Sequence, residues 1–291
     1  MHVAVYGGDL TGLVVARVMR DAGHVVTIVE RDVPGKTATT LRFKFLERTD
    51  EVTKLLDDMG VTFDEYALNI GVMLHGRVLP CRDRLTQAVQ HAYWGKTRMT
   101  SAPEGTVKAI VEPEASTRRR AVALDWGDLR RPLINGADIR SEAEGDFDLT
   151  IETRPLWKSH FVDCQDAMAV TLNMVRVKCV RDSYLRWDLV YTPFTPADCV
   201  HRVYHSGDGY VCEFSGSLDD DRLTSDLNFL FPEGWYVDGE IESGYGHLVP
   251  MPDRPMWPEG VRPIGRLAQW DEQVTMTRVI RSAKAAVSGN A

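Results

Sequence analysis

The chain has 291 residues, a formal net charge of −8, 44% hydrophobic and 26% charged residues, which is typical of a globular rather than a disordered protein. No apolar run approaches the roughly 20 residues that span a bilayer, and the five cysteines are scattered without a CxxC pair, which argues against a disulfide framework or a zinc cluster. We therefore expect a cytoplasmic protein with no metal site and no membrane partner, in which any nucleic acid would have to be met by local basic patches.

The first thirty residues predict a strand, a glycine turn, a helix and a second strand. Residues 2–6 and 25–30 are short apolar runs, as in parallel strands buried on both faces, and residues 13–21 carry apolar side chains at helical spacing. Gly7 and Gly12 fill the first and third positions of the G-x-G-x-x-G dinucleotide fingerprint, where they allow a tight turn and close helix–strand packing. Glu30 lies 23 residues after Gly7, where an acid accepts hydrogen bonds from ribose hydroxyls. The predicted cofactor-binding residues here are Gly7, Gly8, Asp9, Leu10, Thr11, Gly12 and Glu30. A βαβ unit without a nucleotide remains the alternative.

Asp9 occupies the second glycine's position in this fingerprint. A carboxylate beside a diphosphate is repelled, by about 1 kcal/mol at about 4 Å in water and by several times that when partly buried. A nearby arginine would offset this repulsion. Asp9 could instead turn away and cap the helix that begins near Leu10 or Thr11.

The middle of the chain carries several basic clusters. The segment HAYWGKTR places Lys96 and Arg98 beside two aromatic residues, near the end of a helix predicted to start at about Arg84. It predicts either a surface that stacks a base and grips a phosphate, or core aromatics with snorkelling cations. Residues 118–120 and 130–131 are further runs of arginine.

A second group of candidate residues lies on predicted strands after residue 188. Strand alternation places Arg202 and Tyr204 on one face, where they could line a substrate pocket with Tyr191 or belong to a sheet core. Residues 219–221 are consecutive acids without the alternating spacing of a calcium loop, and we expect them in a solvated loop. The chain has no nucleophile elbow, Walker loop or HExxH helix, so the chemistry would come from a cofactor.

The C-terminal segment VRPIGRLAQWDEQVTMTRVIRSAKAAV combines Gly265 and Arg266, an aromatic residue and an amphipathic helix predicted over residues 274–286. It resembles the flavin-contact segment of UDP-galactopyranose mutases and the related amine-oxidase-like flavoproteins. The resemblance implies that this segment meets the N-terminal turn across the sheet, that FAD is the cofactor, and that Arg266 contacts its phosphates. It also implies cofactor contacts around Gly265, Trp270 and Val274. Arg31 and Lys36 follow the second strand and would add positive charge.

Three internal segments extend the resemblance. DFDLTIETRPLWKS is similar to the crossover strand of these flavoproteins, while GRVLPCRDRLTQAVQHAYWGKTR and RRRAVALDWGDLRRPL resemble a phage and actinobacterial subset that includes FAD-dependent α-glycyltransferases of thymidine hypermodification. This implies a transferase that joins glycine to an activated pyrimidine methylene, in the host cytoplasm if phage-encoded. The candidate catalytic residues are Lys96, Arg98, Arg202 and Tyr204. The alternatives are an FAD-dependent amine or amino-acid oxidoreductase, a mutase-like enzyme, and a binding protein without turnover.

Together these observations predict an α/β fold with a doubly wound, Rossmann-like FAD-binding sheet and a smaller α+β substrate domain. The predicted FAD-binding domain comprises residues 1–40, 120–158 and 245–291. The predicted substrate domain comprises residues 41–119 and 159–244. The expected partner is a small amino acid or amine, or a nucleotide or DNA bound through the basic clusters.

Overall fold

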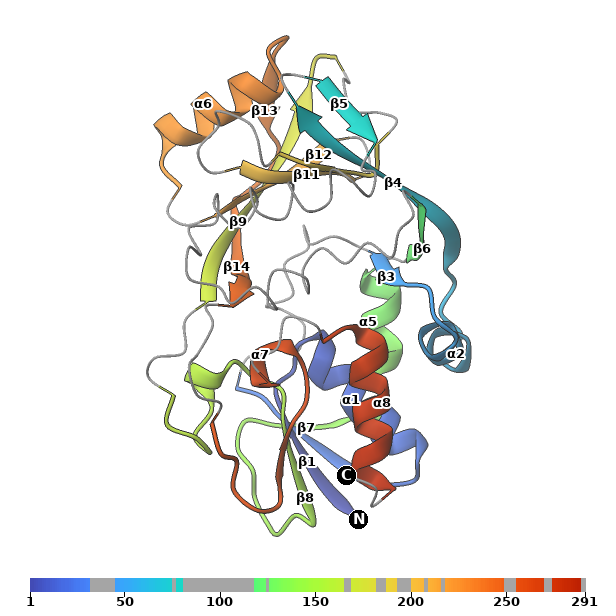
Figure 1. Cartoon of the computed structure of the whole chain (residues 1–291). Coiled ribbons are helices and arrows are strands. Elements are labelled where there is room, and N and C mark those ends of the chain that lie inside the picture. Colours follow the sequence, from blue (N-terminus) through green and yellow to red (C-terminus); the bar gives the residue numbers. More distant parts are fainter. Residues whose placement is uncertain are drawn as a thin grey trace.

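The computed structural model describes twelve segments of the chain, which cover residues 1–31, 45–74, 77–80, 118–123, 126–164, 169–181, 187–192, 200–206, 209–215, 218–248, 255–269 and 274–288. Within these residues the strands form a five-stranded and a ten-stranded sheet. Figure 1 shows the two sheets at opposite ends of the molecule, with both termini beside the five-stranded sheet.

The five-stranded sheet is parallel throughout and has the strand order β15-β8-β1-β2-β7. Its strands are β1 (His2–Tyr6), β2 (Val25–Val29), β7 (Asp138–Arg140), β8 (Leu149–Glu152) and β15 (Val261–Pro263). The chain adds β2 and β7 on one side of β1, and β8 and β15 on the other. The carboxyl ends of β1 and β8 therefore form the topological switch point, where open α/β sheets bind their ligands. The predicted doubly wound sheet is confirmed.

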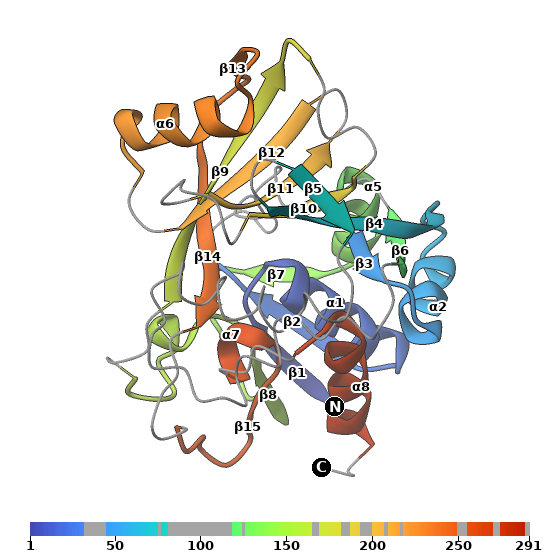
Figure 2. The same ribbon diagram turned by 45° about the horizontal axis from the view of Figure 1, so that its top comes forward.

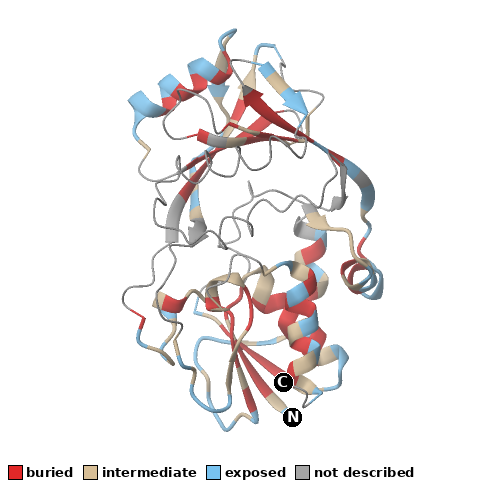
Figure 3. Cartoon of the chain, viewed as in Figure 1, coloured by how far each residue is buried: buried red, intermediate tan, exposed pale blue. Residues whose placement is uncertain are grey.

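Helices from both ends and from the middle of the chain pack beside this sheet (Figure 1). They are α1 (Leu10–Asp21), α5 (Trp126–Ile134) and α8 (Met276–Val287). The shared core includes Leu13, Met19, Ile28, Leu129 and Ile280, each at most 1% exposed, and Figure 3 shows this buried layer between the strands and the helices. Two further short helices, η1 (Leu156–Lys158) and α7 (Arg266–Gln269), contact each other.

The ten-stranded sheet is mostly antiparallel, with β10 and β4 as a parallel pair. Its main path runs β13-β9-β12-β11-β10-β4-β6-β3, and β14 and β5 pair with β9 and β4. The strands are β3 (Phe45–Glu47), β4 (Asp64–Leu74), β5 (Arg77–Pro80), β6 (Arg118–Ala123), β9 (Ala169–Cys179), β10 (Leu189–Tyr191), β11 (Val200–Ser206), β12 (Gly209–Ser215), β13 (Trp235–Val237) and β14 (Glu242–Leu248). Helix α6 (Asp220–Leu230) packs on this sheet through Leu223, Leu227 and Leu230. Figure 2 shows α6 on the side of the sheet away from the five-stranded sheet.

The predicted element bounds differ from the structure in several places. Helix α1 begins at Leu10, as expected for a helix capped by Asp9, while α8 spans Met276–Val287 rather than residues 274–286. The three acids at 219–221 do not form a loop. Asp219 caps α6 by accepting a hydrogen bond from the Arg222 N–H at 2.9 Å, and the next two acids lie in its first turn, where negative charge stabilises a helix.

The predicted domain boundaries at residues 120 and 245 fall within β6 and β14. Both strands pair with the ten-stranded sheet. Helix α2 (Asp50–Asp58), from the predicted substrate domain, packs against α8. The helix predicted from Arg84 lies outside the described residues.

Candidate functional site

Two glycines in the turn after β1 occupy positions that no side chain can enter. Gly7 has a φ of 115°, and a Cβ atom there would lie 2.4 Å from Thr153 Oγ1 and 3.2 Å from Arg154 Cγ. A Cβ atom on Gly12 would lie 1.9 Å from the carbonyl oxygen of Gly7 and 2.9 Å from Thr153 Oγ1. The turn is therefore packed directly against the end of β8, as the first and third fingerprint glycines require.

Asp9 caps α1 with its carboxylate. Its φ of −76° and ψ of −178° are extended values, so the backbone at this position needs no glycine. The Asp9 Oδ1 atom accepts a hydrogen bond from the Gly12 N–H at 3.0 Å. Capping, one of the two expectations from the sequence, is therefore what the structure shows. The consequence is that a carboxylate stands at the helix N-terminus, which is the position that attracts phosphate in dinucleotide-binding folds.

Glu30 lies beside the same turn. Its backbone N–H donates to the Arg140 carbonyl oxygen at 2.8 Å, and its Oε2 atom accepts the Gly8 N–H at 2.8 Å. The acid predicted to bind ribose hydroxyls thus lies at the carboxyl end of β2, over the glycine turn. Arg31 follows it and is exposed. Lys36 lies outside the described residues.

The C-terminal segment reaches the turn through Gly265. The Ile264 N–H donates to the Glu152 carbonyl oxygen at 2.9 Å, so β15 ends beside β8. Gly265 has a φ of 106°, and a Cβ atom there would lie 2.6 Å from Thr11 Cγ2. The two ends of the chain therefore meet at the carboxyl edge of the parallel sheet. Arg266 begins α7 next to this contact.

Two other predicted cofactor residues lie farther along the same segment. Val274 packs against the core that contains α1, and Trp270 lies outside the described residues. The residues at this edge of the sheet fit the ADP half of a dinucleotide, because a side-chain-free turn, a helix N-terminus and an acid after β2 lie together. The Asp9 carboxylate at the helix N-terminus opposes a bound diphosphate.

The ten-stranded sheet places Arg202 and Tyr204 on one face, as predicted. Arg202 lies opposite Glu213 on β12 and Tyr191 on β10, while its neighbour Val203 packs on the α6 side. The Arg202 Nη2 atom donates to Glu213 Oε1 at 2.8 Å, and Nε donates to Oε2. The Glu213 side chain is 2% exposed and that of Arg202 is 28% exposed. The face that bears Arg202 is turned away from α6, toward the five-stranded sheet (Figure 1).

The structure describes only some of the remaining basic candidates. Lys96 and Arg98 lie outside the described residues, and the side chains of residues 118–120 are likewise not described. Arg130 is half-buried and Arg131 is exposed on α5. The DNA-binding surface expected from these clusters therefore stays a prediction.

No role was predicted from the sequence for the side chains at the end of β8. Glu152 is fully buried and pairs with Arg154, whose guanidinium lies 4.7 Å from the centre of the Tyr6 ring. Arg154 also contacts His160. The available signal was a buried apolar strand that ends in a glutamate two residues before an arginine, because a buried carboxylate needs a cationic partner.

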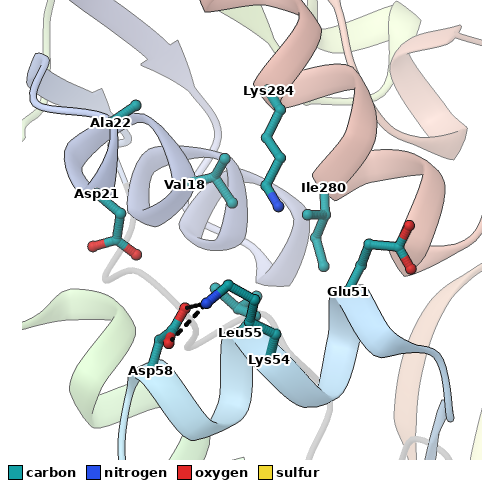
Figure 4. Close-up of a pocket in the computed structure, with 9 residues that line it drawn as sticks. All are labelled: Val18, Asp21, Ala22, Glu51, Lys54, Leu55, Asp58, Ile280 and Lys284. Atoms are coloured by element: carbon teal, nitrogen blue, oxygen red, sulfur yellow. Dashed lines mark hydrogen bonds and ion pairs between the residues drawn. The ribbon is translucent and has the colours of Figure 1, made fainter.

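A shallow cavity of about 260 Å³ lies on the outer side of the helices, between α1, α2 and α8. Figure 4 shows Lys54 and Asp58 paired across one turn of α2, and Lys284 reaching toward the cavity from α8. Its lining residues are Val18, Asp21, Ala22, Glu51, Lys54, Leu55, Asp58, Ile280 and Lys284. Because the cavity adjoins the last turns of α1, it is separate from the glycine turn at the first.

The described residues include no group of three or more His, Cys, Asp or Glu side chains placed to hold a metal ion. None of the helices in this part of the chain is both long and apolar enough to cross a bilayer.

Comparisons with known proteins identify the fold. No family model and no curated protein matches the sequence. Among solved structures, the chain is similar to an oxidoreductase from Methanosarcina mazei, with a TM-score of 0.61 and 12% identity over 99% of this chain and 100% of that one. Glycine oxidase from Bacillus cereus has a TM-score of 0.58 and 14% identity over 100% of this chain and 95% of that one. L-proline dehydrogenase from P. horikoshii has a TM-score of 0.58 and 12% identity over 100% of this chain and 94% of that one. The chain therefore has the α/β fold of these oxidoreductases, with a doubly wound parallel sheet and an additional domain.

Proposed function

We propose that this protein is an FAD-dependent oxidoreductase that acts on a small amine or amino acid. One observation carries the proposal, namely the contact of Gly265 with Thr11 beside the glycine turn, which brings both ends of the chain to the topological switch point. The names of similar structures agree with this class, since they include a glycine oxidase, an L-proline dehydrogenase and an L-amino acid deaminase.

The glycine turn and its neighbours would hold the ADP half of FAD. Gly7 would form the tight turn and Gly12 the close contact between α1 and the sheet that place the turn beside the diphosphate, and Glu30 would bind the ribose hydroxyls. Arg266 would supply positive charge that offsets Asp9. Bound in this way, FAD supplies the two-electron acceptor for the substrate.

Arg202 is our candidate for binding a substrate carboxylate. The ion pair with buried Glu213 fixes the guanidinium on the sheet face that is turned toward the parallel sheet. Because Nε and Nη2 already donate to Glu213, a substrate carboxylate would meet the Nη1–Nη2 edge of the guanidinium, which also presents two parallel N–H groups. Tyr204 lies on the same face. Because lysine keeps the charge but loses the fork, we expect Arg202→Lys to raise KM for an amino acid about tenfold while changing KM little for an amine without a carboxylate.

The test begins with the purified protein and FAD. We expect bound FAD with oxidised-flavin absorbance, bleaching of that absorbance when a substrate from a panel of small amines and amino acids is mixed in without oxygen, and peroxide when an oxidase substrate is mixed in air. A protein that takes up no FAD would overturn the proposal. If no amine or amino acid in the panel reduces the bound flavin, the proposed oxidation of amines is wrong.

The sequence resemblance supports a second candidate, glycyl transfer to an activated pyrimidine. In that reaction the glycine amino nitrogen forms a bond to the pyrimidine methylene, the bond from that methylene to pyrophosphate breaks, and the nitrogen loses a proton. Release of pyrophosphate from pyrophosphorylated hydroxymethyl-deoxyuridine DNA in the presence of glycine would favour this candidate. Peroxide formed from a simple amine alone would favour oxidation. A bound flavin whose spectrum, oxidised or dithionite-reduced, responds to neither substrate would indicate a binding protein.

A further inference from the structure

Four side chains at the carboxyl ends of β1 and β8 form a connected group, which we call the β8-end cluster. Its members are Tyr6, Glu152, Arg154 and His160. The cluster borders the glycine turn, because a Cβ atom on Gly7 would lie 3.2 Å from Arg154 Cγ. It therefore lies at the switch point, although no fingerprint residue belongs to it.

Glu152 and Tyr6 hold the Arg154 guanidinium in one orientation. The Glu152 carboxylate is fully buried and accepts the Arg154 backbone N–H at 2.9 Å, Nε at 2.9 Å and Nη2 at 2.6 Å. A buried carboxylate is stable only when such donors compensate for its lost hydration. The Tyr6 ring packs against the same guanidinium at 4.7 Å, within cation–π distance.

Arg154 in turn determines the tautomer of His160. Its Nη2 atom lies 3.3 Å from His160 Nδ1. A guanidinium can only donate hydrogen bonds, so Nδ1 must accept, and a neutral imidazole then carries its proton on Nε2. Tyr6 and Phe161 fix the ring through contacts of 5.1 and 4.0 Å between ring centres.

The surroundings of His160 favour its neutral form. Partial burial and then the Arg154 cation hold the pKa of His160 below its usual value, and Arg31 acts in the same direction against the opposing Glu152 carboxylate. At neutral pH the imidazole is therefore uncharged, with Nε2–H as its donor. His160 is exposed, so a ligand can reach it.

We propose that His160 is a ligand-binding residue, aligned by Glu152 and Arg154, that donates its Nε2–H to a phosphate oxygen of the nucleotide bound at the glycine turn. The inference rests on the proposed function, because the nucleotide is the ADP half of FAD. Arg154 and Arg31 both act on the imidazole as cations, against the single opposing Glu152 carboxylate, so the chemistry favours a negatively charged acceptor. This hydrogen bond would give the diphosphate a second anchor on the β8 side of the turn, away from the Asp9 carboxylate.

The first test measures binding of ADP and FAD to the full-length apoprotein, from which any bound flavin has been removed. His160→Phe keeps the ring contacts and removes the donor, so we expect roughly fivefold weaker binding of both ligands. His160→Gln retains an N–H donor and should stay within about twofold of the wild type. His24→Phe is the matched control. His24 lies just before β2, at the amino ends of the parallel strands and away from the glycine turn, so this substitution should not change binding.

The second test observes the imidazole directly by nitrogen-15 NMR. We expect His160 in the wild type to be protonated on Nε2, and its resonances to move when ADP is added. Arg154→Gln should give a mixture of tautomers and a higher pKa for His160, because the cation is lost while the Glu152 carboxylate remains. That readout distinguishes positioning by Arg154 from a merely structural role.

The outcomes separate this inference from the proposed function. If the wild type binds both ligands and His160→Phe binds them equally well, the inference is wrong and the proposed function stands. If FAD but not ADP moves the His160 resonances, the assignment to a phosphate oxygen is wrong. A wild type that binds ADP but not FAD overturns the proposed function alone, and one that binds neither overturns both.

Discussion

Asp9 shows how one residue can depart from a sequence fingerprint while the backbone keeps its path. The second fingerprint position has extended backbone angles here, so an aspartate adopts them without strain. Its carboxylate then caps α1 through the Gly12 N–H. The negative charge therefore weakens binding of a diphosphate and does not destabilise the fold, because the capped N-terminus is the one that a diphosphate would approach.

Replacing Asp9 with asparagine separates these two effects. Asparagine caps a helix as well as aspartate does, so the free energy of unfolding should change by less than about 0.5 kcal/mol. Removing one negative charge about 4 Å from a phosphate should strengthen FAD binding roughly fivefold. Flavin fluorescence quenching and urea denaturation measure the two quantities. Weaker FAD binding by Asp9→Asn would show that the carboxylate does not oppose the cofactor.

A substitution at Gly12 tests whether the glycine turn depends on close packing at this position. Gly12→Ala places a methyl group against the Gly7 carbonyl oxygen, and such overpacking should cost about 1–3 kcal/mol and weaken FAD binding. Gly60→Ala is the matched control, because Gly60 has a φ of 66° and no atom within 4 Å of the added methyl. It should cost only about 1 kcal/mol and leave FAD binding unchanged. Equal losses in the two variants would contradict the packing argument.

At the scale of elements, the C-terminal helix α8 packs beside the parallel sheet and also contacts the segment that contains β3 and α2. The backbone N–H of Thr277 in α8 donates a hydrogen bond to Glu47 Oε1 in β3 at 2.9 Å. The Thr277 hydroxyl lies 2.8 Å from the Thr49 hydroxyl at the start of α2. Arg281 adds an ion pair to Glu51 of α2. Helix α8 therefore connects the segment that contains β3 and α2 to the parallel sheet.

The ion pair between α2 and α8 predicts a pH dependence of stability. The hydrogen bond from Arg281 lowers the pKa of Glu51 below its usual value. A carboxyl group with a lowered folded-state pKa stabilises the protein above its unfolded-state pKa, and this contribution is lost as the pH falls through the folded-state pKa. We expect Glu51→Gln to lower Tm slightly at neutral pH and to match the wild type at a pH below both values. A difference that grows as the pH falls would contradict this assignment.

Elements with strong local patterns could be predicted from the sequence. The βαβ unit at residues 2–30 and the helix near residue 280 have regular apolar spacing, and the structure contains both. The acids at 219–221 were misassigned because they were considered as possible metal ligands, although an aspartate before two further acids is also a typical helix start. The arginine–glutamate pair on β11 and β12 could not be predicted, because strand register depends on contacts distant in sequence.

At the scale of the whole molecule, the candidate site depends on strands that are far apart in the chain. Strand β1 lies beside β8 and two places from β15, and no local periodicity predicts that order. Only the resemblance to flavoproteins predicted that Gly265 would approach the first turn. The β8-end cluster was missed for the same reason, because Tyr6 and Arg154 become neighbours only when β1 and β8 pair.

The central claim is that the N-terminal glycine turn and the segment at Gly265 bind the same FAD molecule. The most direct measurement is the FAD affinity of the wild type, of Gly265→Ala and of Gly239→Ala. Both glycines have a positive φ, but only at Gly265 does the added methyl meet another residue, Thr11 at 2.6 Å. We predict that the wild type and Gly239→Ala bind FAD equally and that Gly265→Ala binds it at least roughly tenfold more weakly, as expected when the binding geometry is displaced. A wild type that binds no FAD, or a Gly265→Ala variant that binds it as tightly as the wild type, would contradict the account.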